Sequence, residues 1–186
     1  AARELRDKAP AHELAAYAGL RLAALQARGG GAEALDAAMT LYQQLAEKPF
    51  NARVGAEALF QAASLAYTRG QFETSARLFR QLAERHPGDL RAREAARPSA
   101  WAHYRTGRYA DALETAAAGA AVADQTADAR AEWLYLQANC ERQLDRRAEA
   151  LRSYAALLAA EPNSAFAPAA RYERLLVLFK EGAYAQ

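Results

Sequence analysis

The residues with the most reactive side chains in this sequence are three histidines and one cysteine. No two of His12, His86 and His103 are spaced as H-x-x-x-H or H-E-x-x-H, the patterns that bring two imidazoles onto one helix face to bind zinc. Cys140 has neither a second cysteine nor a nearby histidine, so it can form neither a multi-cysteine metal site nor an activated nucleophile. We predict no metal site and interpret Cys140 as a small buried side chain.

Two further patterns are compatible with catalysis or phosphate binding only at first sight. The glycine run 29–31 is not followed by Lys and Ser or Thr, as a phosphate-binding loop would be, and it favours a turn between helices. The carboxylates Glu13, Glu33 and Asp36 fall on helix faces that we expect to be solvated. Because no nucleophile, base and oxyanion donor can be grouped, we predict a non-enzymatic segment without a cofactor.

The composition indicates a helical chain with no charge bias. The 186 residues include 52 Ala and 23 Leu but only 3 Val and no Ile. Ala and Leu are strong helix formers, whereas sheet cores usually depend on Val and Ile. Lys and Arg number 24 against 22 Asp and Glu, so the net charge of +2 gives no reason to expect nucleic acid as a partner. No apolar run is long enough to span a bilayer.

Turn signals recur along the chain at a nearly constant spacing. Gly70, Gly107, Asp145 and Gly182 follow one another after 37, 38 and 37 residues, and the glycine run near residue 30 marks an earlier turn. Such a period of 35 to 40 residues is typical of helical repeat proteins, in which each helix pair buries its apolar face only by stacking on its neighbours.

The best-defined unit joins two helical patterns at Gly70. Aromatic Phe72 follows the turn, small Ser75 lies three residues later, aromatic Phe79 comes four further on, and Pro87 ends the second pattern. This order resembles the tetratricopeptide repeat, a helix–turn–helix unit usually of 34 residues. The resemblance extends over nearly the whole chain, and it is weakest in the third unit.

The resemblance implies an all-α fold, a right-handed α-solenoid of antiparallel helix pairs. Residues 1–186 would form a single array of about four to five units. The long period and the strings HPGD and EPNSAFAPAA resemble the envelope-type variant of the Tol-Pal cell-division coordinator and of outer-membrane assembly lipoproteins. That variant favours the bacterial periplasm or cell envelope over the cytoplasm. Neither end carries a polar cap, so we expect an excerpt from a longer array.

The apolar periodicity and the turn signals predict a series of helices, with residues 1–8 as the tail of an earlier one. They are expected at 12–28, 33–48, 53–69, 71–85, 90–106, 108–123, 128–144, 146–160 and 165–181. Pro98 should either kink its helix or mark the start of that helix, with 90–97 as a separate turn. The stretch TAAAGAAVA, in the second helix of the third unit, offers little apolar bulk, and we expect this unit to be the softest.

The resemblance also implies a ligand-binding face. With each turn residue counted as position fifteen, positions two, five, nine, twelve and thirteen of the first helix usually line the concave side of such repeats. On this chain they carry aromatic rings and interspersed cations, the residue types that dominate interface energetics. The predicted groove residues are Phe60, Tyr67, Arg97, Trp101, Tyr104, Arg105, Tyr135, Asn139, Arg142, Tyr172 and Phe179.

Arginine binds carboxylates through two parallel hydrogen bonds, so this face suits an extended or helical peptide that carries an acidic group. An alternative stays open, in which the rings at positions five and twelve pack against a neighbouring unit.

Three functions are compatible with this reading. The first is a protein-interaction scaffold within a bacterial multiprotein assembly, with a protein or peptide as its partner. The second is the helical superhelix of a larger enzyme, such as a peptidoglycan lytic transglycosylase. The third is an array that self-associates head to tail through its uncapped ends.

Overall fold

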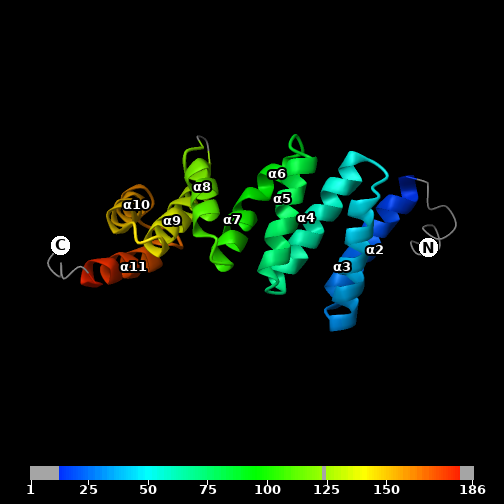
Figure 1. Ribbon diagram of the computed structural model, residues 1–186, viewed down its shortest axis with the longest axis horizontal. Helices are drawn as coiled ribbons and strands as arrows, with labels where there is room; N and C mark the ends of the chain where they lie inside the picture. Colours follow the sequence, from blue (N-terminus) through cyan, green and yellow to red (C-terminus); the bar gives the residue numbers. More distant parts are fainter. Residues whose placement is uncertain (1–12, 123–124, 181–186) are drawn as a thin grey trace. The chain divides into compact units, whose positions relative to one another are not determined.

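The computed structural model describes residues 13–122 and 125–180, and within them every regular element is an α-helix (Figure 1). This confirms the all-α prediction. The helices are α2 (Glu13–Gly29), α3 (Ala32–Glu47), α4 (Ala52–Thr68), α5 (Phe72–Arg85), α6 (Leu90–Glu94), α7 (Ala96–Arg105), α8 (Tyr109–Ala120), α9 (Ala127–Gln143), α10 (Arg147–Ala160) and α11 (Ala167–Lys180). The turn predicted at Gly182 and the helix tail predicted at residues 1–8 lie outside the described residues.

The chain forms two compact units, Ala1–Ala102 and His103–Gln186. In the first unit, α2, α3, α4 and α5 pack against one another in chain order, and the short α6 contacts both α4 and α5. In the second unit, α8 packs on α9, α9 on α10 and α10 on α11. Helices that pack on their neighbours in the sequence are the arrangement of an α-solenoid, as the repeat predicts.

The turns between paired helices share one backbone geometry. Gly30, Gly70 and Gly107 have φ angles of 77°, 72° and 77°, and Asp145 takes the same left-handed conformation with φ of 58°. At residue 70, the N–H of Gly70 bonds to the carbonyl of Tyr67 and that of the next residue to Ala66, and the same pair of bonds recurs at 107 and 145. This Schellman motif ends the first helix and sets the direction of the second.

First helices and second helices begin differently. Asn51, Asp89 and Thr126, which precede α4, α6 and α9, each accept a hydrogen bond from a backbone N–H in the first turn of the following helix. No side chain caps α5, α8 or α10. A first helix follows a loop and requires a side-chain cap for its unpaired N–H groups. A second helix follows the Schellman turn directly, and we attribute its lack of a cap to that connection.

A small residue lies where the two helices of a pair cross. Ser75 is fully buried, and its hydroxyl donates a hydrogen bond of 2.9 Å to the carbonyl oxygen of Ala63 on the facing helix. Ala112 and Ala150 are the equivalent buried residues of the later pairs. Aromatic rings fill the space beside the crossing, with Phe79 1% exposed and Tyr154 fully buried. The small residues of the repeat pattern thus lie where the two helices of a pair cross.

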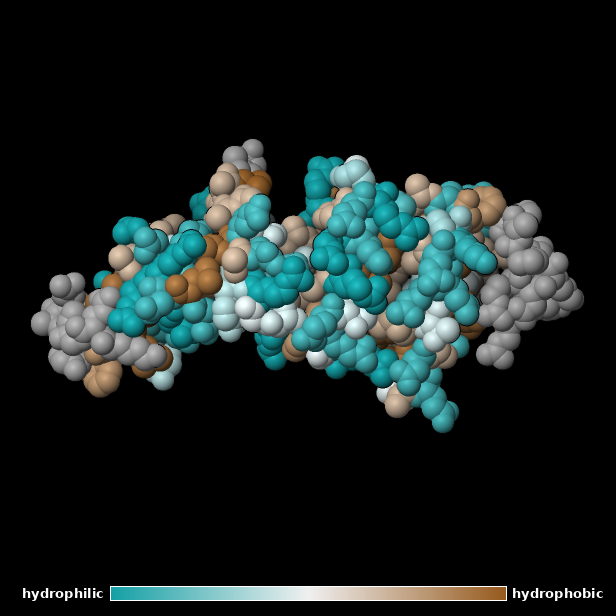
Figure 2. Space-filling view, viewed as in Figure 1, coloured by the Kyte–Doolittle hydropathy of each residue, from teal (hydrophilic) through white to brown (hydrophobic). Residues whose placement is uncertain are grey.

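The outer face of α5 shows the opposite pattern of side chains. Ser75, Ala76, Leu78, Phe79 and Leu82 are buried. The charged residues between them, Glu73, Arg77, Arg80 and Glu84, are exposed. Figure 2 shows this surface of α5 covered by hydrophilic side chains. Such alternation at the helical period explains why α5 packs on α4 through one face only.

Pro98 lies near the start of a helix. The segment predicted at 90–106 is divided at Ala95 into α6 and α7, and Pro98 is the third residue of α7. Proline is tolerated in a first turn because its missing N–H would have no partner inside the helix. The structure thus agrees with the second of the two expectations, a helix that starts near Pro98 after a separate turn.

The second helix of the third repeat, α8, makes a contact that the weak apolar pattern of its sequence did not reveal. A Cβ atom on Gly119 of α8 would lie 2.3 Å from Cε2 of Trp133 on α9, far below van der Waals contact. Trp133 is 7% exposed, so the indole ring is buried against the bare backbone of α8. Gly119 therefore lets the backbone of α8 pack directly against the Trp133 ring of α9, the first helix of the next pair.

We predict that Gly70→Ala lowers the free energy of unfolding by about 1 kcal/mol, because a Cβ is unfavourable at positive φ. Gly88→Ala is the matched control, since Gly88 also has open space around it but no positive φ. Its effect should stay within about 0.5 kcal/mol. Urea denaturation followed by circular dichroism measures both, and equal effects would contradict the assignment of the turn.

We predict that Gly119→Ala costs about 1–3 kcal/mol, because the added methyl group overlaps the Trp133 ring. In a Trp133→Leu background, which removes the overlapping ring atoms, the same substitution should cost much less. A double-mutant cycle of thermal or urea unfolding measures this coupling. Additive costs would show that the ring does not set the requirement for glycine.

Candidate functional site

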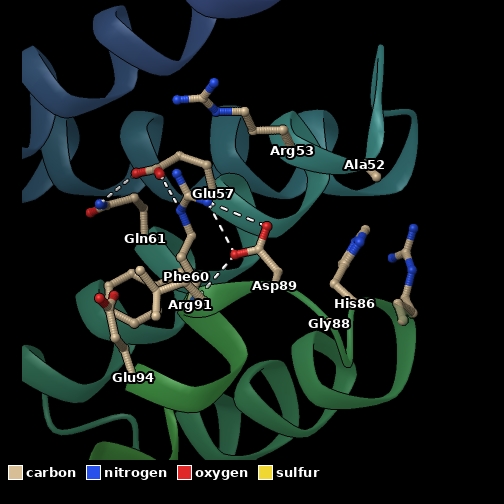
Figure 3. Close-up of a pocket in the computed structure, with 12 residues that line it drawn as sticks. Ala52, Arg53, Glu57, Phe60, Gln61, His86, Gly88, Asp89, Arg91 and Glu94 are labelled. Carbon is tan, nitrogen blue, oxygen red and sulfur yellow. Dashed lines mark hydrogen bonds and ion pairs between the residues drawn. The ribbon is translucent and has the colours of Figure 1, made fainter.

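A groove opens in the first unit along its first helices. One hollow of about 960 Å³ lies between α4, the end of α5 and α6, and it is lined by Glu57, Phe60 and Arg91 among others (Figure 3). A second hollow of about 460 Å³ adds Tyr17, Leu20 and Arg21 of α2 and shares Arg53, Glu57 and Arg91 with the first. The two hollows are therefore neighbouring parts of one depression, which we call the first-unit groove.

The floor of the groove is fixed by an ionic network around Arg91. The guanidinium Nε of Arg91 donates to a carboxylate oxygen of Glu57, and its NH1 donates to Asp89 Oδ1 at 3.1 Å. The other carboxylate oxygen of Glu57 accepts a hydrogen bond of 2.8 Å from Gln61. In Figure 3 the side chains of Glu57, Arg91 and Asp89 point toward one another. This network ties the five residues of α6 to α4.

The Asp89 carboxylate accepts hydrogen bonds from both the backbone and the side chain of Arg91. Its Oδ1 accepts a hydrogen bond of 2.9 Å from the backbone N–H of Arg91, which caps α6, and it also binds the Arg91 guanidinium. The N–H bond and then the guanidinium hold the pKa of Asp89 below its ordinary value. Its contribution to stability is therefore present at neutral pH and is lost as the pH falls below about 4.

His86 lies at the edge of the groove beneath α4. Its Nε2 would be 3.1 Å from a Cβ on Gly55, closer than ordinary van der Waals contact, so Gly55 leaves room for the ring. Burial first, and then the nearby charge of Arg85, lower the pKa of His86, while Asp89 acts in the opposite direction. Neutral His86 is thus favoured in the folded chain, and we interpret it as a packing residue at the groove edge.

The predicted groove rings at positions five and twelve pack within their own helix pairs. Phe60 stacks edge-on against Phe79 with ring centroids 6.1 Å apart, and Tyr67 against Phe72 at 5.3 Å. The same contacts recur in the second unit, where Tyr104 lies 5.4 Å from Tyr109 and Tyr135 lies 6.4 Å from Tyr154. The open alternative expected these rings to pack against a neighbouring unit, whereas these contacts join the two helices of one pair. Phe60 is also part of the lining of the first-unit groove.

Asn139 and Arg142 are held in a network inside the second unit. Asn139 is only 3% exposed; its Oδ1 accepts a hydrogen bond from the Tyr154 hydroxyl at 3.1 Å, and its amide donates to the Tyr135 carbonyl at 2.8 Å. Arg142 forms an ion pair with Glu173 at 3.3 Å. These side chains connect α9 to α10 and α11, so we leave Asn139 out of the proposed binding surface.

The remaining predicted residues differ in exposure. Arg97 and Arg105 of α7 are exposed, and Trp101 between them is half-buried. Because the boundary between the two units falls inside α7, these residues are not assigned to one site. Tyr172 and Phe179 on α11 are 62% and 63% exposed.

Several groove residues were not predicted from the sequence. Position two was expected to line the concave face, but the residues at that position were not named. They are Tyr17, Glu57 and Glu94, and all three line the first-unit groove. Counting position two in each unit would have found them. Asp89 and Arg91 could not be found in this way, because they belong to the short helix α6 that interrupts the repeat.

The described residues contain no group of three or more His, Cys, Asp or Glu arranged to hold a metal ion. Cys140 is fully buried, as predicted, and burial together with Glu141 raises its pKa to about 12, so its thiol stays protonated. Among the described helices, none is both long and apolar enough to cross a membrane.

Comparison with known families supports the repeat directly. The family model described as tetratricopeptide repeat matches residues 57–89 and 134–164, which correspond to the pairs α4–α5 and α9–α10. The chain contains tetratricopeptide repeats. Repeats of this family mediate protein–protein interaction and typically form non-catalytic scaffolds.

Two solved structures share the fold of this chain. MamA 41-end from Desulfovibrio magneticus RS-1 has a TM-score of 0.72 at 14% identity, over 91% of this chain and 86% of that one. A tetratricopeptide repeat protein from Parabacteroides merdae ATCC 43184 has a TM-score of 0.71 at 19% identity, over 98% of this chain and 65% of that one. No curated protein sequence matches the chain.

We predict that Arg91→Ala loosens α6, because it leaves the carboxylates of Glu57 and Asp89 facing each other without a cation. The half-buried network should contribute about 1 kcal/mol, and amide hydrogen exchange over residues 89–95 should become faster. Arg93→Ala is the matched control, since Arg93 is an exposed arginine of the same helix. If the two variants exchange equally fast, the network does not hold α6 in place.

Proposed function

We propose that this protein is a non-catalytic interaction scaffold that binds an acidic peptide segment of a partner in the first-unit groove. The observation that carries the proposal is the contrast between two kinds of arginine there. Arg91 is neutralised by Glu57 and Asp89. Arg21 and Arg53 are exposed and form no hydrogen bond or ion pair with another described residue.

The two exposed arginines supply the charge for recognition. Both line the second hollow, Arg21 from α2 and Arg53 from α4, beside the half-buried side chains of Tyr17 and Leu20. A carboxylate placed between them could accept charge-assisted hydrogen bonds, which are about twice as strong as neutral ones. Tyr17 and Leu20 offer apolar area for a neighbouring side chain of the peptide.

The shape of the groove suits a peptide better than a small molecule. Its two hollows follow the first helices for the width of two repeats, and both are open to solvent. Small-molecule sites usually enclose most of their ligand, whereas an open, partly apolar groove with charged edges is typical of peptide recognition. We infer that several residues of the partner bind along α2, α4 and α6.

We also propose that the partner belongs to a bacterial multiprotein assembly in the cell envelope. The long repeat period and the HPGD and EPNSAFAPAA strings support this setting, and the two structural neighbours come from bacteria. Arg97 and Trp101 of α7, which lie in the same unit as the groove, are proposed as a continuation of the recognition surface.

Selection of twelve-residue peptides from a random display library tests the proposed function. We predict that the selected peptides are enriched in Asp and Glu next to an apolar residue. Arg53→Glu should weaken their binding at least tenfold in fluorescence anisotropy, because it replaces attraction by repulsion within the groove. Higher ionic strength should also weaken binding.

Arg77→Glu is the control variant, since Arg77 is an exposed arginine on the outer face of α5, away from the groove. Its charge change is the same, so general electrostatic attraction would affect both variants alike. Equal losses for Arg53→Glu and Arg77→Glu, or selected peptides without acidic residues, would refute the proposed site.

A further inference from the structure

The charges that line the first-unit groove change from one end to the other. The second hollow is lined by three arginines and one carboxylate, whereas the first is lined by three arginines and three carboxylates. The two hollows share Arg53, Glu57 and Arg91, so the difference comes from the residues that each hollow has to itself. Arg21 of α2 adds a cation to the second hollow, and Glu94 of α6 adds an exposed carboxylate to the first. The groove is therefore cationic on the α2 side and contains an anionic group on the α6 side.

Glu94 is the carboxylate of the groove that is available to a ligand. Glu57 and Asp89 are both bound to the Arg91 guanidinium. Glu94 is exposed and forms no hydrogen bond or ion pair with another described residue. Arg93, the other exposed charged residue of α6, does not line the hollow. A carboxylate that lines a hollow without a cation of its own is suited to accept charge-assisted hydrogen bonds from a lysine or arginine of a ligand.

Glu94 lies at a distance from Arg53 that a short peptide segment can span. Figure 3 shows these two side chains on opposite sides of the Arg91 network. α4 and α6 are in contact, and packed helix axes are about 8–10 Å apart. Glu94 comes four residues after the position that corresponds to Arg53 in the 37-residue repeat, which adds a rise of about 6 Å along the helix. Together these offsets amount to roughly 10–12 Å, or about three to four residues of an extended chain.

We propose that the groove selects peptides that carry an acidic and a basic residue about three to four positions apart, and that Glu94 binds the basic one. This proposal rests on the proposed function, because it keeps the acidic residue between Arg21 and Arg53. An apolar residue between the two charges would pack on Phe60 and Leu90, which both line the first hollow. Leu90 is 59% exposed, so it offers apolar area to a ligand. Glu94 is thus a specificity-determining residue of the groove.

The two kinds of charge also fix the direction of the bound peptide. A peptide that bound in the opposite direction would place its basic residue beside Arg21 and Arg53 and its acidic residue beside Glu94. Like charges brought together in this way disfavour the reversed complex. The acidic and the basic residue should therefore follow one another in the same order in every peptide that binds tightly.

Parallel selections of twelve-residue peptides on the wild type and on Glu94→Lys test the proposal. Peptides selected on the wild type should carry Lys or Arg at the expected distance from their acidic residue, always on the same side of it. Peptides selected on Glu94→Lys should keep the acidic residue and lose the basic one, because the variant places a cation at that point of the groove. Equal enrichment of basic residues on both proteins, or on both sides of the acidic residue, would overturn the proposal.

A charge swap measures the contact itself. One peptide selected on the wild type and its variant with glutamate in place of the basic residue are titrated into each protein and followed by fluorescence anisotropy. The wild type should bind the original peptide about threefold more tightly, and Glu94→Lys should prefer the glutamate variant by a similar factor, since exposed ion pairs contribute modestly. Glu73→Lys is the matched control, because Glu73 is an exposed carboxylate on the outer face of α5 and lines neither hollow. It should keep the preference of the wild type.

The outcomes separate the role of Glu94 from the function on which it rests. If acidic peptides depend on Arg53 but Glu94→Lys does not reverse the preference, Glu94 does not select the ligand, and the groove still stands as the binding site. A reversal in Glu73→Lys as strong as that in Glu94→Lys would likewise overturn the specific contact. Equal losses of binding in Arg53→Glu and Arg77→Glu would instead refute the groove, and the selection by Glu94 with it.

Discussion

The close crossing of two helices within each pair is the constraint on which the rest of the structure depends. Helix axes approach to the low end of the 8–10 Å range only where both surfaces lack bulky side chains. Ala63 against Ser75 meets that condition, as do the buried alanines of the other pairs. The rings beside the crossing then fill the remaining space, and the left-handed turn at residues such as Gly70 directs the second helix back along the first.

Rings at positions five and twelve of a first helix lie close to the crossing, where the second helix of the same pair provides a ring to stack on. A ring can take part in this stacking and still line a groove, as Phe60 does. Tyr17 and Glu57 at position two line the same groove.

The start of α6 shapes the polar floor of the first-unit groove. Asp89 directly precedes Leu90, where the helix begins, so it caps α6 and lies two residues before Arg91. The start of α6 therefore brings together the carboxylates of Asp89 and Glu57 on one guanidinium. Since that arginine is neutralised, the proposed recognition of an acidic peptide depends on the exposed cations Arg21 and Arg53. A scaffold protein can thus form a stable groove floor and a charged edge from the same residue type.

The sequence by itself determined the all-α fold, the positions of the turns and the small residues of the repeat pattern. These features depend on the backbone preference of single residues and on the spacing of apolar residues within one helix. Gly70, Ser75 and Pro98 could each be interpreted without knowing what lies opposite them. The tertiary structure decided which side chains remain exposed. Three contacts join residues on different helices. Trp133 packs on Gly119, the Tyr154 hydroxyl donates to Asn139, and Arg91 binds Glu57. Such contacts depend on how separate helices meet, and no periodicity within one helix specifies them.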